Sequence, residues 1–282
     1  MKSPYFTSGL FQLIATFLIA GVLTGCATVS EQAVRLSDGI DASAGGGPAY
    51  IITTSTATYY LEKEGGGLSS MLDVNGVDWL GFHSEKGSGH KGEYRGFPNA
   101  VHRQDGNYFH AMNAGTDPST SVVDIESGQH VRITFTSDNG QWEGQWDFYS
   151  DRCDFTMSKV SDGYKYWVQY EGVPGGKMDS TDFWYRSGDK QRYLIEEQSL
   201  SDLPGPEWMA FGDQDSPRML YVVNHTDDNH PDDYVSRPHM TVLGFGRRNK
   251  DKFLTQPQTF SIGFVESTDY TVVENNIKYI LD

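Results

Sequence analysis

The sequence is poor in cysteine and in basic residues, and each shortage excludes a class of protein. It has 2 Cys, and 22 Lys+Arg against 38 Asp+Glu in 282 residues, which gives a formal net charge of −16. Two cysteines exclude a disulfide scaffold, and without CxxC or HExxH spacings the usual zinc motifs are missing. Without a run of Lys or Arg the chain lacks the charge that neutralises phosphates. We therefore expect no nucleic-acid partner and no coating of anionic membrane surfaces.

The N-terminus has the pattern of a secretory signal. Lys2 precedes an apolar run over Leu10–Leu23. The run ends in Leu23-Thr24-Gly25-Cys26, at the distance from the N-terminus where a signal peptide is cleaved. This quartet resembles the bacterial lipobox, which implies that residues 1–25 are removed and that Cys26 becomes a lipidated first residue. Ala27 implies, by the same resemblance, sorting to the outer membrane of the bacterial cell envelope. An uncleaved anchor is the alternative, but the run is short for a span of about 20 residues. Contact with the membrane is thus expected only through the Cys26 lipid.

Composition divides the rest of the chain into a linker and one domain. Residues 26–48 are rich in Ala, Ser, Gly and Asp and show no apolar period, so we expect a lipidated cysteine and a flexible tether there. Residues 49–282 have no later composition shift or repeat. With 37% hydrophobic residues in the whole chain, this length suits one large all-β domain, which we expect to be a monomer.

Apolar residues in this region recur with a period of two, which is typical of strands with one buried face. The pattern is clearest at Val131, Ile133 and Phe135, at Trp142, Trp146 and Phe148, at Tyr166, Val168 and Tyr170, and at Phe260, Ile262 and Phe264. Short turn signals between the runs favour antiparallel pairing. We predict a large antiparallel two-sheet sandwich, of supersandwich or jelly-roll type. A short C-terminal helix is predicted from the apolar stripe Val273, Ile277, Ile280 and Leu281, with Thr268 as its N-cap.

Two segments are similar to galactose-mutarotase-like proteins. The stretch from Gly65 to Leu80 resembles their opening hairpin, and the resemblance implies a supersandwich of the kind shared with several polysaccharide lyases and glycoside hydrolases. Asn224-His225-Thr226 is similar to the tripeptide that carries the general acid of aldose 1-epimerases, which implies that His225 contacts substrate. Those enzymes place a general base in a Glu-Pro-Gln context, whereas Glu266 here stands in Val265-Glu266-Ser267. The resemblance therefore implies the fold and not the mutarotase reaction.

The region from Glu93 to Asn113 concentrates polar chemistry without strand or helix periodicity, as a functional loop on a rigid scaffold does. Histidine transfers protons near neutral pH, and a His or Tyr beside an Arg is what β-elimination from a uronic acid requires. The predicted catalytic residues are His102, Tyr108 and His110, and the predicted substrate contacts here are Arg95 and Asn99. For each histidine alone, a structural role is the competing interpretation.

A second polar region runs from Asp213 to Arg248. Arg237 and His239 are two residues apart in a segment predicted to be extended, so we expect both on one face as substrate contacts. The acidic stretch with Asp227, Asp228 and Asp232 has oxygen ligands for Ca²⁺. A solvated acidic loop explains it more simply, so no metal or other cofactor is predicted.

Aromatic residues are abundant, with 6 Trp and 16 Tyr. Flat rings stack on sugar faces, and Trp184 is a predicted substrate contact for this reason. Tyr166 and Trp167 are neighbours on a strand and must point to opposite faces, so they cannot both be buried on the same side.

Three functions fit these observations. The first is a surface-anchored carbohydrate-active enzyme for an extracellular polysaccharide or oligosaccharide, a polysaccharide lyase ahead of a glycoside hydrolase. The second is a glycan-binding lipoprotein without catalysis. The third is a structural envelope lipoprotein whose aromatic residues form its core.

Overall fold

The computed structural model of the chain describes, besides Met1, residues 33–41, 47–82, 95–113 and 115–282. The lipobox quartet, Cys26 and Ala27 lie outside the described residues, so the signal and lipidation remain predictions. Among the described helices, none has the length and apolar character needed to cross a bilayer.

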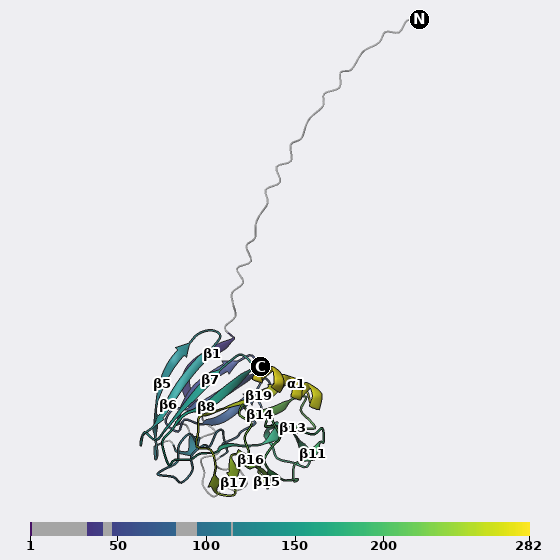
Figure 1. Ribbon diagram of the computed structural model, residues 1–282. Helices are drawn as coiled ribbons and strands as arrows, with labels where there is room; N and C mark the ends of the chain where they lie inside the picture. Colours follow the sequence, from purple (N-terminus) through teal and green to yellow (C-terminus); the bar gives the residue numbers. More distant parts are fainter. Residues whose placement is uncertain (2–32, 42–46, 83–94, 114) are drawn as a thin grey trace. The chain divides into compact units, whose positions relative to one another are not determined.

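Three sheets make up the fold (Figure 1). The nine-stranded sheet consists, in spatial order, of β11 (Tyr193–Leu194), β10 (Asp182–Arg186), β13 (Trp208–Asp213), β14 (Met219–Asn224), β19 (Gln258–Val265), β8 (Arg152–Val160), β7 (Trp142–Phe148), β6 (Val131–Ser137) and β5 (Ser119–Glu126). The six-stranded sheet has a main path of β18 (Asp251–Lys252), β17 (Arg247–Arg248), β15 (Asp232–Arg237), β16 (Met240–Phe245) and β9 (Val168–Gly172), and β12 (Ser199–Ser201) pairs with β15 off this path. The four-stranded sheet consists of β1 (Val34–Asp41), β2 (Gly47–Thr54), β3 (Ala57–Glu62) and β4 (Leu68–Asp73). Two 3-10 turns, η1 (Ala111–Asn113) and η2 (Pro174–Gly176), and one helix, α1 (Tyr270–Leu281), complete the described elements.

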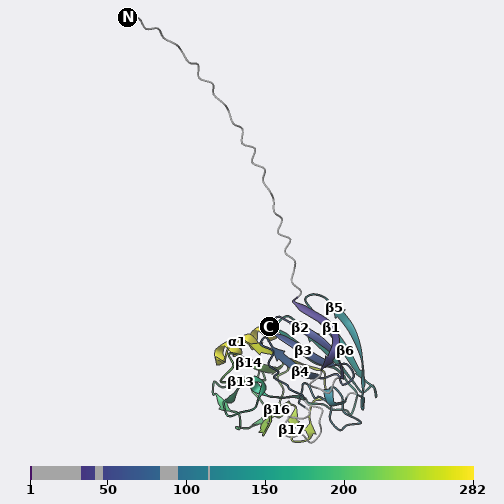
Figure 2. The same ribbon diagram turned by 180° about the vertical axis from the view of Figure 1, so that it is seen from behind.

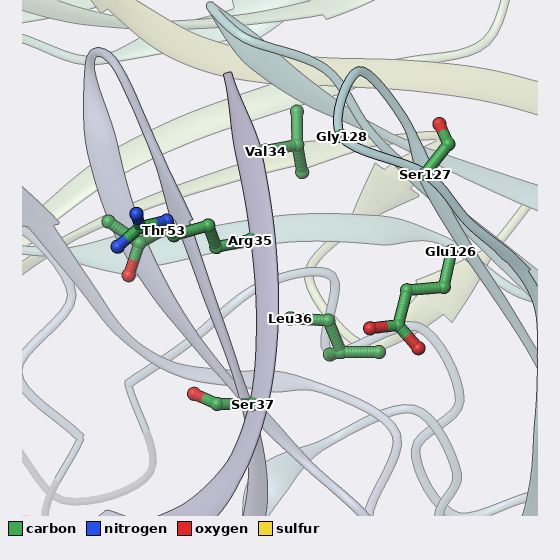
Figure 3. Close-up of a pocket in the computed structure, with 8 residues that line it drawn as sticks. All are labelled: Val34, Arg35, Leu36, Ser37, Thr53, Glu126, Ser127 and Gly128. Carbon is green, nitrogen blue, oxygen red and sulfur yellow. The ribbon is translucent and has the colours of Figure 1, made fainter. Parts of the chain in front are cut away.

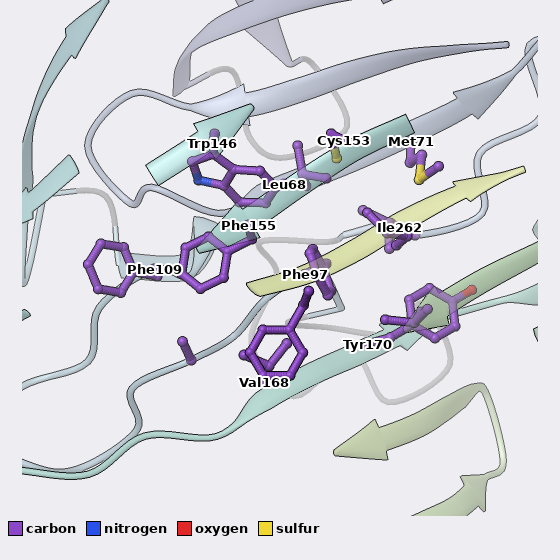
Figure 4. Packing of buried hydrophobic residues seen from close by; sticks show 14 of the residues in the cluster. Leu68, Met71, Phe97, Phe109, Trp146, Cys153, Phe155, Val168, Tyr170 and Ile262 are labelled. Carbon is purple, nitrogen blue, oxygen red and sulfur yellow. The ribbon is translucent and has the colours of Figure 1, made fainter. Parts of the chain in front are cut away.

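The predicted all-β sandwich is confirmed. The strand β6 alternates buried and half-buried residues along its whole length, as its sequence period predicts. One hydrophobic core joins the sheets, with Trp146, Phe155 and Ile262 from the nine-stranded sheet, Met71 from the four-stranded sheet and Tyr170 from the six-stranded sheet (Figure 4). All the named strand pairs are antiparallel except a single parallel contact between β15 and β17.

The C-terminal helix is confirmed, with a corrected start. The stripe of Val273 and Ile277 packs on the outer side of the nine-stranded sheet in a second apolar cluster that includes Tyr221, and α1 lies beside β13 and β14 in both views (Figures 1 and 2). The N-cap is Asp269 and not Thr268, because the Asp269 carboxylate accepts hydrogen bonds from the backbone N–H groups of Thr271 and Val272 in the first turn of the helix.

The folded region begins earlier than predicted. The strand β1, within the expected tether, pairs with β2 over its whole length from Val34 to Asp41. Its side chains are mostly exposed or half-buried, because it is the outermost strand of its sheet. Backbone hydrogen bonds therefore hold a segment whose composition gives little strand signal, and the domain boundary at Ala49 was wrong.

Candidate functional site

The strand β9 divides its side chains between the core and a polar site. Val168 and Tyr170 belong to the hydrophobic core, and the Tyr170 hydroxyl donates to the Trp79 carbonyl at 2.9 Å. Gln169 and Glu171 alternate with them and so point to the opposite face. We call this opposite side of the six-stranded sheet the outer face.

The alternation continues upstream of β9. Tyr166 is in the core, whereas Trp167 is buried at 4% exposure but does not belong to the core cluster. The expectation that the two rings take opposite sides is confirmed. Trp167 is fixed by its indole N–H, which donates to the Asn99 carbonyl at 2.7 Å.

Arg247 crosses the outer face at a position where the sheet has no side chain. Gly244 of β16 pairs with Gln169 of β9, and a Cβ on Gly244 would lie 2.5 Å from the Arg247 Cδ. A glycine at this position is therefore what allows the Arg247 stem to lie flat on the sheet. Its guanidinium carbon lies 5.5 Å from the centroid of the Trp167 ring.

The Trp167 indole is the centre of a cluster of basic groups. The imidazole of His102 stacks on it with ring centroids 6.2 Å apart and planes inclined by 21°, and the Lys252 ammonium lies 4.7 Å from the ring centroid. Cations are attracted to the face of an indole ring. We use the name Trp167 site for the group formed by Asn99, His102, Trp167, Glu171, Arg247 and Lys252.

Glu171 places a carboxyl group within this basic surrounding. Asn99 donates to its Oε2 at 3.0 Å, and Gln169 donates to its Oε1 at 3.3 Å. Burial raises the pKa of Glu171, although the charges of Arg237 and Arg247 act in the opposite direction. The carboxyl is thus held in a defined position with an increased tendency to keep its proton.

Arg247 is a buried cation with hydrogen-bonding capacity to spare. Its exposed fraction is 8%, and within the described ranges its Nε has no hydrogen-bond partner. Burial lowers the pKa of Arg247, and the charge of Glu171 opposes this. A buried donor without an acceptor is costly, so an anionic or hydroxyl group bound here would satisfy a group that the protein leaves open.

The surroundings of His102 favour its neutral form. Its pKa is lowered by burial and then by the charges of Arg103 and Lys252, with Arg247 adding to the effect. A neutral imidazole beside two cations is able to accept a proton, which is the role expected of a general base.

Tyr108 and His110 are not part of the Trp167 site. Tyr108 packs on Trp142, its hydroxyl donates to Asp138, and burial followed by the hydrogen bond to Asp138 raises its pKa. His110 is buried against Phe82, with ring centroids 6.2 Å apart, and its Nδ1 accepts the Met112 backbone N–H. The sequence placed all three catalytic candidates together, but only His102 reaches the cluster.

Trp184 and His225 were also predicted to contact substrate, and neither belongs to the Trp167 site. Trp184 is 1% exposed, stacks on Tyr193 at 4.0 Å and donates to the Leu194 carbonyl, so it is a core residue and not a sugar platform. His225 Nε2 lies 2.7 Å from the Ser261 hydroxyl, which donates to Asp154 at 2.5 Å. Ser261 pairs with Val223, a member of the second apolar cluster, which packs against α1. That cluster lies on the other side of the nine-stranded sheet from the core.

Arg95 is a second buried arginine, separate from the Trp167 site. It is 8% exposed, and its Nε has no hydrogen-bond partner in the part of the chain that the structure describes. Burial lowers its pKa, while the charges of Tyr170 and Asp78 oppose this. Its guanidinium lies beside Gly81, where an added Cβ would be 3.0 Å from Nη1.

The expected common face of Arg237 and His239 does not exist. Arg237 is the last residue of β15 and pairs with Met240, so Pro238 and His239 form the two-residue turn of a hairpin. The intervening residue is a turn residue rather than an extended one, and the alternation argument fails there. Arg237 still lies close enough to Glu171 and Arg247 for its charge to affect both.

Among the described residues, one group of carboxylates is compact enough to share a cation. Asp202, Glu207 and Asp232 each offer an oxygen, and these atoms lie within 4.8 Å of one another. Of the three sequence candidates only Asp232 belongs to it. Asp228 instead accepts the His230 N–H and the Gln258 amide, so the acidic stretch is not one ligand set.

At least two cavities open at the surface of the residues that the structure describes. The first, about 430 Å³, lies between β1 and the turn after β5, with Val34, Arg35 and Glu126 in its wall (Figure 3). It contains none of the predicted site residues. The second, about 310 Å³, has Arg237 in its wall, a residue whose charge also acts on Glu171 and Arg247 of the Trp167 site.

Sequence reasoning did not single out Glu171, Arg247 or Lys252 as site residues. A polar residue that alternates with core residues on a strand is normally assigned to solvent. The nearest signal was the strict alternation of Tyr166, Val168 and Tyr170, which places Trp167 and Glu171 together on the other face.

Comparison with known proteins identifies the fold. No family model matches the sequence, and no curated protein does. Among solved structures, the protein HI1317 superposes with a TM-score of 0.52 at 13% identity, over 82% of this chain and 99% of the other. A galactose mutarotase related enzyme from Lactobacillus acidophilus gives 0.50 at 8% identity, over 78% and 99%. The α-N-acetylgalactosaminidase NagBb of Bifidobacterium bifidum, in complex with GalNAc, gives 0.51 at 14% identity, over 82% of this chain and 38% of that one. The predicted galactose-mutarotase-like fold is thus supported by structure.

Proposed function

We propose that the protein is a carbohydrate-active enzyme that cleaves an anionic glycan at the Trp167 site, as a polysaccharide lyase. The observation that carries this is the buried guanidinium of Arg247, whose Nε is unpaired within the described ranges, beside the neutral imidazole of His102. A cation that binds a carboxylate and a base that removes a proton are the two requirements of β-elimination from a uronic acid.

The residues divide the reaction between them. Arg247, with the charge of Arg237 close by, would bind the C5 carboxylate of the sugar and so acidify the adjacent C–H bond. His102 would take the C5 proton, the electron pair would form the C4–C5 double bond, and the C4–O bond would break. The leaving oxygen needs a proton, and Glu171, whose pKa burial raises, is suited to supply it.

The net charge of the chain does not contradict an anionic substrate. The formal charge of −16 repels such a glycan at long range, but screening limits this repulsion to about 8–10 Å in physiological salt. Within that distance the substrate would meet the positive charges of Arg237, Arg247 and Lys252. The neighbours named above as a mutarotase-related enzyme and an α-N-acetylgalactosaminidase share the fold alone and do not decide the reaction.

The test is ultraviolet absorbance of the unsaturated product after mixing with a panel of uronate polysaccharides. We expect turnover by the wild type and by Glu126→Gln, an exposed control far from the site, and strongly reduced turnover by His102→Gln and by Arg247→Met. New reducing ends without ultraviolet absorbance would replace the lyase by a hydrolase. Retardation in affinity electrophoresis without any product would leave glycan binding alone.

We also propose that the protein is anchored in the outer membrane by a lipid on Cys26. The support is the lipobox resemblance. Metabolic labelling with palmitate in a bacterial host should mark the wild type and Cys153→Ala, whose thiol is buried, and should not mark Cys26→Ala. Label on Cys26→Ala would refute the anchor.

A further inference from the structure

We propose that the cavity next to Arg237 is a second sugar subsite of opposite charge, so that the substrate alternates a carboxylate-bearing sugar with one that has no negative charge. This inference rests on the proposed function, because it extends the same binding surface. It concerns the second cavity described above, which none of the sequence predictions included apart from Arg237.

The cavity has the composition of a sugar subsite. Its volume is about 310 Å³, and its apolar wall consists of Met178, Ile195 and Pro238. Its charged wall has Asp179, Glu196 and Arg237. Apolar surface that packs on the C–H face of a ring, next to a few polar groups that take its hydroxyls, is the usual lining of a small polar-ligand site.

A buried carboxyl behind this wall has an unused oxygen. Asp182 is 1% exposed, and its Oδ2 accepts the backbone N–H of Asp179, a residue of the wall, at 2.9 Å. Its Oδ1 has no hydrogen-bond partner among the residues that the structure describes. An unpaired buried oxygen is costly unless a ligand, water or proton satisfies it.

The surroundings of Asp182 are negative. Burial raises the pKa of Asp182 to about 7, the hydrogen bond from the Asp179 N–H acts in the opposite direction, and the charges of Asp213, Asp179 and Glu196 raise it further. An additional carboxylate in this cavity would face repulsion from Asp179 and Glu196, which outnumber the one cation of the wall, Arg237. A neutral or amine-bearing sugar would not, and its hydroxyl or amino groups would find acceptors there.

Arg237 joins this acidic subsite to the basic Trp167 site. It is in the wall of the cavity, and its charge acts on Glu171 and Arg247 of the Trp167 site. Two adjacent sites of opposite sign discriminate by repulsion as well as by attraction. A chain in which every sugar is a uronate would place a carboxylate against Glu196, whereas an alternating chain would not.

The experiment measures calorimetric affinity for two hexasaccharides: oligogalacturonate, in which every unit is anionic, and heparosan, in which a uronate alternates with N-acetylglucosamine. Binding is compared between the wild type and Glu196→Gln, an exposed position whose change should leave the fold intact. We expect the variant to bind oligogalacturonate about threefold tighter and to bind heparosan unchanged or more weakly. Glu126→Gln is the matched control and should change neither affinity.

Equal effects of Glu196→Gln on both probes, or no effect on either, would overturn the inference. Failure of the proposed function has a different signature. In that case Arg247→Met would retain the affinity of the wild type for both probes. The effect of Glu196→Gln on the two probes would still decide whether the cavity discriminates by charge. Raising the salt concentration should reduce the difference between the two probes in the wild type, because the discrimination is electrostatic.

Discussion

The imidazole of His102 and the indole of Trp167 lie nearly parallel, inclined by 21°, while two cations approach the same indole ring. This relationship orients the proposed base and keeps it unprotonated. We therefore expect His102→Gln to lower kcat by about a hundredfold or more and to leave glycan affinity nearly unchanged. Steady-state kinetics together with calorimetric binding check this. A variant with wild-type kcat would remove His102 from the mechanism.

The pH dependence should respond to the cations around His102. Burial and then the charges of Arg103 and Lys252 lower its pKa, so the active neutral form persists below the usual titration range of histidine. Lys252→Gln removes one positive charge, which makes protonation easier, and the acidic limb of the kcat/KM profile should move to higher pH. Lys250→Gln, at an exposed position nearby, is the control. A limb that does not move in Lys252→Gln would show that another group controls it.

Tyr108 should matter for stability and not for turnover. Its hydroxyl donates to Asp138 and its ring packs on Trp142, so Tyr108→Phe removes one hydrogen bond from a packed position. We expect the free energy of unfolding to fall by about 1 kcal/mol with kcat unchanged, measured by urea denaturation and by turnover. The opposite result, a stable variant without activity, would restore Tyr108 as a catalytic residue.

A buried ion pair connects the four-stranded and nine-stranded sheets. Arg218 donates to Asp73, whose side chain is 2% exposed, and to both oxygens of Glu266. Arg218→Met leaves the Asp73 carboxylate buried without its cation, and we expect a loss of about 3–5 kcal/mol in urea unfolding. Arg35→Met, at an exposed arginine, is the control. Adding Asp73→Asn to Arg218→Met should recover part of the loss, and no recovery would mean that the ion pair is not the cause.

Stability should fall as the pH rises through the acidic range. Burial, together with the charge of Asp228, raises the pKa of Glu207 from 4.5 to about 7. The folded protein then holds a proton that the unfolded chain has released, so the contribution is complete below pH 4.5 and is lost as the pH approaches 7. Glu207→Gln should flatten the unfolding free energy over this window, and Glu126→Gln should not. Parallel curves for the wild type and Glu207→Gln would contradict the raised pKa.

The sequence predicted the parts of the fold that depend on local periodicity. The strand β6 and the helix α1 have strong periods, and both formed where the apolar residues recur. The strand β1 was missed because an outermost strand is held by backbone pairing and needs little apolar surface. The N-cap was displaced by one residue because Thr268 and Asp269 are both good caps, and only the backbone conformation decides between them.

The site was harder to predict, because its residues come together only through sheet register. His102 and Asn99 were found from the polar density of their segment. Glu171 and Arg247 were not, since the first resembles a solvent-facing strand residue and the second crosses the sheet only because Gly244 leaves space. Tyr108 was assigned to catalysis because it lies in the same polar segment as two arginines and two histidines, but its ring packs in the core.

The alternation along β9 means that assembling the core and assembling the site are a single event. A shift of one residue in the pairing of β9 with β16 would turn Glu171 into the apolar interior and Tyr170 outward. The core-facing and outward-facing side chains of β9 would exchange places together. No intermediate with a formed core and a wrongly assembled site is available along this strand. Insertion of one residue between Trp167 and Glu171 should therefore abolish folding and function together, whereas a disturbance confined to the Pro238-His239 turn would leave the pairing of β9 with β16 in place.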